Sequence, residues 1–99
     1  MGGEARVIIK QNEYMRKFRN ARALDATTAR RPDELTIEPD RIFRQMLGKD
    51  VFRPGRAPGT YYMDPSAAEG FVEARRRRAF YIMLLILIVA ALMFFLGRR

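Results

Sequence analysis

The apolar residues of this chain are concentrated in one uninterrupted run near its C-terminal end. Residues 79–96 read AFYIMLLILIVAALMFFL and contain no charged residue, no glycine and no proline. About 18 helical residues measure roughly 27 Å, close to the ~30 Å hydrocarbon core of a bilayer. The rest of the chain is too short to enclose a helix that is apolar on every side. The run therefore predicts a transmembrane helix over residues 79–97, with membrane-spanning side chains that include Phe80, Tyr81, Leu84, Leu87, Phe94 and Phe95.

The charges that flank this run predict its orientation. Four arginines, residues 75–78, precede it, and only Arg98 and Arg99 follow. The excess of positive charge on the N-terminal side places the preceding residues in the cytoplasm. Because the run ends three residues before the C-terminus, we expect a tail-anchored, single-pass membrane protein, in the inner membrane if the source is bacterial.

The arginine run has two possible ligands. Next to a membrane it attracts anionic lipid, with about 1 kcal/mol for each arginine near the surface. The same composition is typical of a nucleic-acid patch or a nuclear signal. Contiguity with the apolar run favours membrane lipid, so the residues expected to contact lipid head groups are Arg75, Arg76, Arg77 and Arg78.

The residues before this anchor alternate between short periodic segments and breakers. Residues 1–11 are expected to be flexible, and Asn12 to cap a helix that ends near Leu24. Within that helix Tyr14, Phe18 and Ala21 recur at i, i+4 and i+7, which is the spacing of one buried face.

Two prolines followed by acids mark further helix starts. Pro32 opens a one-turn helix, and Pro39 opens a helix that extends to about Gly48. The second of these carries an apolar stripe made of Ile42, Phe43, Met46 and Leu47.

The sequence after residue 50 predicts a hairpin and then a long helix. Residues 51–53 and 60–63 are β-prone runs, and the six residues between them include two prolines and two glycines that force a turn. Asp64 and Pro65 then start a helix of about 33 residues, in which the juxtamembrane part over residues 65–78 continues into the span.

The order helix, one-turn helix, helix, hairpin resembles a winged helix-turn-helix domain over residues 12–64. The segment PDEL at residues 32–35 is similar to the start of that family's second helix. Met46-Leu47, a short polar link and Val51-Phe52 are similar to the end of its recognition helix and the following strand. Gly59 with the two tyrosines after Thr60 is similar to the return of its wing. The resemblance implies a mainly α fold with a small β-hairpin and a role in binding a macromolecule.

Charge decides between two partners for this winged-helix-like head. Its candidate contacts to a protein or a nucleic acid are Arg41, Arg44, Gln45, Arg53 and Arg56. Residues 38–50 hold three acids and three bases, whereas DNA affinity comes largely from phosphate neutralisation. We therefore expect an adaptor or accessory subunit that binds another protein, with a membrane-tethered DNA-binding protein as the alternative.

Composition narrows the chemistry that the chain can perform. The 99 residues include 19 Lys and Arg against 11 Asp and Glu, for a net charge of +8, and no cysteine or histidine. A thiolate zinc site, a cysteine nucleophile and a histidine base are therefore excluded. The lone serine, Ser66, has no histidine to activate it, and the clustered acids of the head are explained by helix capping. We expect no catalytic site, no metal and no cofactor.

Overall fold

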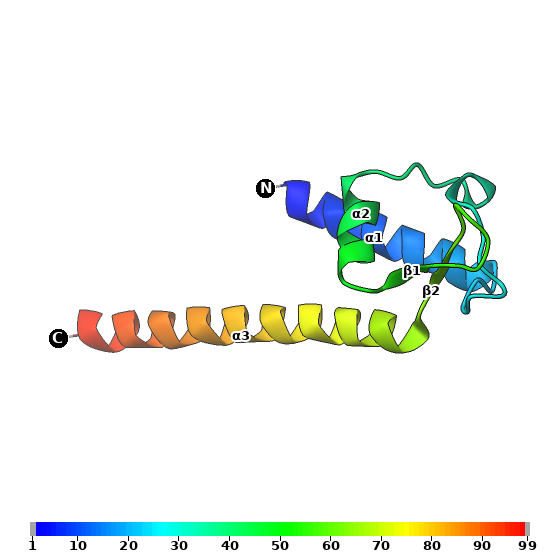
Figure 1. Ribbon diagram of the computed structural model, residues 1–99. Helices are drawn as coiled ribbons and strands as arrows, with labels where there is room; N and C mark the ends of the chain where they lie inside the picture. Colours follow the sequence, from blue (N-terminus) through cyan, green and yellow to red (C-terminus); the bar gives the residue numbers. More distant parts are fainter. Residues whose placement is uncertain (1, 99) are drawn as a thin grey trace. The chain divides into compact units, whose positions relative to one another are not determined.

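A computed structural model describes residues 2–98 (Figure 1). The expectations that concern Met1 and Arg99 lie outside these residues. The chain divides into two units, which are described separately: the head, up to Glu69, and the tail, from Gly70 onward. As the sequence predicts, the fold is mainly helical with one two-stranded antiparallel hairpin and a long C-terminal helix.

Helix α1 extends from Gly2 to Asn20, so it begins ten residues before the predicted cap at Asn12. The structure thus has a helix over the described residues of the segment up to residue 11, where the sequence predicted no regular element. The physical reason is local, because this segment has no proline, carries Glu4 in the first turn and contains the good helix formers Ala5 and Lys10.

Helix α1 also ends earlier than predicted, because Arg22 adopts a left-handed backbone with φ of 57°. The next residue, Ala23, then donates its N–H to the Phe18 carbonyl at 3.0 Å. The same closure follows the next two helices, where Thr36 and Asp50 have φ of 57° and 61°. In each case the residue after the left-handed position is buried, namely Ala23, Ile37 and Val51. The repeated motif satisfies the last carbonyls of a helix and returns the chain to the core.

The two proline signals correspond to two short helices. The 3₁₀-helix η1 covers Pro32–Leu35, and helix α2 covers Arg41–Gly48. Helix α2 starts two residues after Pro39, because Asp40 acts as its N-cap and accepts a hydrogen bond from the Phe43 N–H at 2.9 Å.

The hairpin consists of β1, Phe52–Pro54, and β2, Tyr61–Met63, with Arg53 opposite Tyr62. The other edge of β2 pairs with Arg30, whose N–H and carbonyl both bond to Tyr61 at 2.8 Å. Glycine is needed at residue 55, because a side chain there would collide with Ala29 and Thr60. The hairpin is therefore fixed on both sides, by its own turn and by the loop after α1.

Aromatic rings from three elements form the centre of the head. Phe18 of α1 stacks on Phe52 of β1 with centroids 4.4 Å apart, and Phe52 stacks on Phe43 of α2 at 5.1 Å. The buried hydrophobic residues are Tyr14, Met15, Phe18, Ala23, Ile37, Phe43, Met46, Val51, Phe52, Met63 and Ala68.

Helix α3 covers Pro65–Gly97, 33 residues without a break, as predicted. Its first turn belongs to the head, where Ala68 is buried. The rest forms the tail, which is one continuous helix from Gly70 to Gly97.

Candidate membrane anchor and interaction surface

The apolar part of α3 is exposed along its whole length. Each of its large hydrophobic residues from Phe80 to Leu96 is between 43% and 71% exposed, and the apolar stretch has no buried share. Among the described residues, α3 is the one helix long and apolar enough to cross a membrane. Soluble monomers rarely expose an apolar surface of this extent. The predicted membrane-spanning residues Phe80, Tyr81, Leu84, Leu87, Phe94 and Phe95 all lie on this surface.

Residues 75–78 form an arginine collar on α3 directly before the apolar stretch. Successive residues of an α-helix are about 100° apart, so four consecutive side chains point in four directions around the axis. The Arg75 guanidinium lies 5.7 Å from the centroid of the Phe71 ring, and Arg98 lies 5.1 Å from that of Phe94. Both ends of the apolar stretch therefore carry a cation that also contacts an aromatic ring.

Helix α2 presents a polar face opposite its buried stripe. Phe43 and Met46 are buried, whereas Arg41, Arg44 and Gln45 are exposed. We call these three side chains the α2 face. Arg44 and Gln45 lie three and four residues after Arg41, and therefore share one side of the helix with it. The Arg44 Nη1 donates to the Pro39 carbonyl at 3.2 Å, and no ion pair forms with either arginine among residues 2–98.

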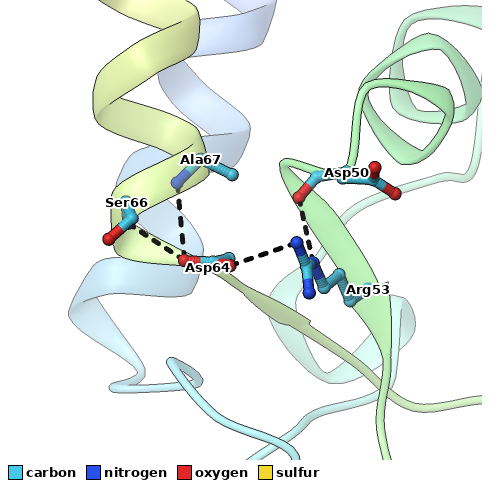
Figure 2. A network of polar contacts seen from close by, with 5 residues as sticks. All are labelled: Asp50, Arg53, Asp64, Ser66 and Ala67. Atoms are coloured by element: carbon cyan, nitrogen blue, oxygen red, sulfur yellow. Dashed lines mark hydrogen bonds and ion pairs between the residues drawn. The ribbon is translucent and has the colours of Figure 1, made fainter.

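Arg53, also predicted to contact a partner, has an internal role in the structure. Figure 2 shows its guanidinium between the Asp50 carbonyl, 3.4 Å from Nε, and the Asp64 carboxylate, 3.4 Å from Nη2. The other oxygen of Asp64 accepts the N–H groups of Ser66 at 3.0 Å and Ala67 at 3.4 Å. Arg53 thus connects the hairpin to the N-cap of α3.

Arg56 lies in the turn of the hairpin and is exposed. Its backbone N–H donates to the Ala26 carbonyl at 3.3 Å, and its side chain has no ion pair among the described residues. Both predicted hairpin arginines are exposed, and Arg56 is the one without an ion pair among the described residues.

A partly buried Tyr–Asp pair joins α1 to the start of α2, and sequence reasoning did not find it. The Tyr14 hydroxyl donates to the Asp40 Oδ2 at 2.7 Å. Burial and this bond to a carboxylate raise the pKa of Tyr14 to about 12. Partial burial acts against ionisation of Asp40, but the Phe43 N–H and the Tyr14 hydroxyl outweigh it and hold the pKa of Asp40 below its ordinary value. The sequence analysis predicted Tyr14 on the buried face of its helix, but it placed the start of the next helix at Pro39 and so did not identify Asp40 as a partner.

The described residues contain no group of three acids, histidines or cysteines placed to hold a metal ion. The site is therefore built from surfaces rather than from a reactive cluster: the apolar stretch of α3, the arginine collar and the α2 face. The chain was compared with protein-family models, curated proteins and solved structures, and none of the three comparisons gave a match.

Proposed function

We propose that this chain is a membrane protein anchored by α3, whose head is a cytoplasmic interaction module that binds another protein as an adaptor or accessory subunit. The observation that carries the anchoring is the apolar stretch of α3, which is exposed along its whole length and bordered by the arginine collar. A helix satisfies its own backbone hydrogen bonds, so this stretch is stable in hydrocarbon and unfavourable in water.

The geometry of the collar favours lipid over nucleic acid. Residues 75–78 point in four directions around the axis of α3, whereas a nucleic-acid duplex or a protein groove meets one side of a helix. A layer of head groups surrounds the helix, so every arginine of the collar reaches a phosphate. This supports anionic lipid as the ligand of the collar and the cytoplasm as the side of the head.

The head is compatible with a winged helix in the order of its elements. Helix α1, η1, α2 and the hairpin follow one another in the order on which the resemblance to that family rests. The α2 face is then the equivalent of the recognition surface. Among the predicted contact residues, Arg53 is paired with Asp64, which leaves Arg41, Arg44 and Arg56 as the cations of this surface without an ion pair. This small number supports a protein partner over DNA.

Protease protection tests the anchoring and its orientation. In sealed right-side-out vesicles the head of the full chain should resist added protease and become sensitive once the vesicles are opened. Digestion of the head in intact vesicles would contradict the orientation. Extraction of the chain by alkaline carbonate would contradict the anchoring itself.

Charge reversal on the α2 face tests the interaction module. The double variant Arg41→Glu, Arg44→Glu should lose the protein captured from membrane extracts, with and without nuclease. The matched control is Arg16→Glu, Arg19→Glu, two exposed arginines of α1, which should retain it.

Salt dependence tests the DNA alternative. Three phosphate contacts would give a slope of log K against log salt of about −2.7. With the collar changed to glutamine, we expect duplex DNA to bind the head with a Kd of only about 10⁻⁴–10⁻⁶ M, the range of non-specific binding. Submicromolar binding to one sequence over scrambled competitors at physiological salt would favour DNA as the partner.

A further inference from the structure

The first half of α1 carries an exposed apolar pair that the core does not use. Ile8 is 39% exposed and Ile9 is 65% exposed. Outside the apolar stretch of α3, no other large hydrophobic residue in the described part of the chain is exposed to this degree. Burial in α1 begins further along, at Tyr14 and Met15. The pair therefore contributes little to the core of the head.

Basic side chains border this pair. Arg6 is exposed and lies one turn before Ile9 on the helix, since residues three apart are neighbours. Lys10 follows directly and reaches over the Tyr14 ring at 6.0 Å from its centroid. The acids of the same helix are Glu4, in the first turn, and Glu13, which pairs with Lys17 at 3.4 Å. The cations therefore flank the pair on the side of Ile9, and Ile8 lies on the other side of Ile9.

We propose that the first half of α1 is a second membrane contact, in which Ile8 and Ile9 enter the interface of an anionic bilayer and Arg6 and Lys10 bind its lipid phosphates. This inference rests on the proposed anchoring by α3. Exposed isoleucines beside cations are the features of helices that lie in a membrane interface. The anchor makes this contact intramolecular, which raises the effective concentration of the bilayer around the head.

The size of the patch argues against a second copy of the chain as its occupant. A stable dimer buries about 800 Å² on each partner, far more than two partly exposed isoleucines supply. The cations at its border fit a layer of phosphates, and would repel the same patch on another copy.

A single fluorophore on the full chain tests the proposal. The sequence contains no cysteine, so Ala5→Cys gives one labelling site, on the exposed surface four residues before Ile9. The probe is an environment-sensitive dye on protein reconstituted in vesicles of phosphatidylcholine, with or without phosphatidylglycerol. The matched control is the same dye at Ala57→Cys, an exposed position in the hairpin turn. A third label, at Leu87→Cys, reports the anchor.

With phosphatidylglycerol present, the Ala5 dye should show a blue-shifted emission and reduced quenching by aqueous iodide, whereas the Ala57 dye should not. Ile8→Ser, Ile9→Ser should abolish the shift, and Arg6→Glu should weaken it more than Arg19→Glu. About 1 M salt, which shortens the Debye length to about 3 Å, should weaken it as well.

The labels separate failure of this inference from failure of the anchoring. A Leu87 dye in hydrocarbon together with an Ala5 dye as quenchable as the Ala57 dye would overturn the membrane contact alone. A Leu87 dye exposed to iodide would overturn the anchoring and with it this inference. A blue shift at Ala5 that is independent of lipid charge and grows with protein density would overturn the proposal in favour of a second copy.

Discussion

The head and the tail contain similar hydrophobic residues in opposite surroundings. In the head, the buried hydrophobic residues are at most 4% exposed, whereas in α3 those from Phe80 to Leu96 are at least 43% exposed. The difference follows from the pattern of apolar residues, because α2 of the head has one apolar stripe and the stretch of α3 over residues 79–96 is apolar all round. A stripe is covered by other parts of a small domain, and a fully apolar helix requires a solvent that is itself apolar.

The basic residues of the head and of the tail also have different surroundings. Lys17, Arg30, Arg31 and Arg53 each pair with an acid of the head. Within residues 2–98, no such ion pair is formed by Arg76, Arg77 or Arg78 of the arginine collar. Cations that are compensated stabilise a fold in water, whereas the collar is suited to an external source of negative charge.

The largest expected effect is the loss of membrane insertion by the tail alone. The double variant Leu84→Arg, Leu87→Arg places two charges in the apolar stretch, at a cost to insertion of about 5–7 kcal/mol. We expect the chain to become extractable from membranes by alkaline carbonate. The head should remain folded, because none of its core residues lies in that stretch.

The matched control for this variant is Leu84→Ile, Leu87→Ile, which keeps the volume and the hydrophobicity and should stay in the membrane. Retention of the arginine variant in carbonate would contradict insertion of α3 through the bilayer.

The next largest expected effect is a loss of stability in the head alone. Phe18 is fully buried and stacks on Phe52, so Phe18→Ala should cost about 3–5 kcal/mol, comparable to the whole stability of a small domain. Urea unfolding of the detergent-solubilised chain, followed by tyrosine near-UV circular dichroism, should show the head unfolded or greatly destabilised. Membrane retention should be unchanged.

The control for Phe18 is Phe95→Ala in the tail, which should leave the unfolding midpoint of the head where it is. A head that keeps its midpoint after Phe18→Ala would show that α1 does not pack on the hairpin.

Most of this architecture could be predicted from the sequence, because its signals are local. The apolar run determined α3, the two Pro-acid pairs located η1 and α2, and the six-residue turn located the hairpin. The start of α1 could not be predicted in the same way. The first ten residues of α1 carry no periodic apolar stripe. Asn12 is a residue type that is common at N-caps, although it lies inside the helix.

The candidate site was only partly predictable, for a different reason. Exposure of the α2 face follows from helical spacing, which a sequence contains. The engagement of Arg53 by Asp64 joins residues eleven apart across a hairpin, and depends on a register that no composition encodes. The left-handed positions at Arg22, Thr36 and Asp50 were missed because none of them is a glycine.

A smaller effect on stability is expected from the loss of a polar contact within the head, the bond between Tyr14 and Asp40. Tyr14→Phe removes the bond to Asp40 and should cost about 1.5 kcal/mol, the lower end for a hydrogen bond to a charged group. The pH dependence of unfolding should change with it. Because the pKa of Tyr14 is raised to about 12, its contribution is complete below the unfolded pKa of about 10 and is lost as the pH rises from there to about 12.

The acid side has the opposite sign. The pKa of Asp40 is lowered, so its contribution is present above the unfolded pKa of about 4 and is lost as the pH falls through the folded value. Urea titrations between acid and alkaline pH measure the free energy of unfolding on both sides. Because Tyr14→Phe removes the group that titrates at high pH, the stability of this variant should fall less steeply at alkaline pH than that of the parent. Identical profiles for the two chains would mean that the Tyr14–Asp40 bond does not hold α1 to the start of α2.

The smallest effect is a gain of stability at the end of η1. Thr36 is exposed, β-branched and held at φ of 57° and ψ of 41°, a region that disfavours residues with a Cβ by about 1–2 kcal/mol. Glycine loses more backbone entropy on folding, which offsets roughly 0.5–1 kcal/mol of that relief. Thr36→Gly should therefore stabilise the head by about 0.5–1 kcal/mol, seen as a higher urea midpoint.

The variant keeps the carbonyl of residue 36, which accepts a hydrogen bond from the Lys17 Nζ at 2.8 Å. Thr36→Ala is the matched control, because it removes the branched side chain and leaves the left-handed strain, so its midpoint should stay close to that of the parent. A lower midpoint for the glycine variant would show that this turn relaxes in solution, and that the head closes its helices less tightly than its three left-handed residues indicate.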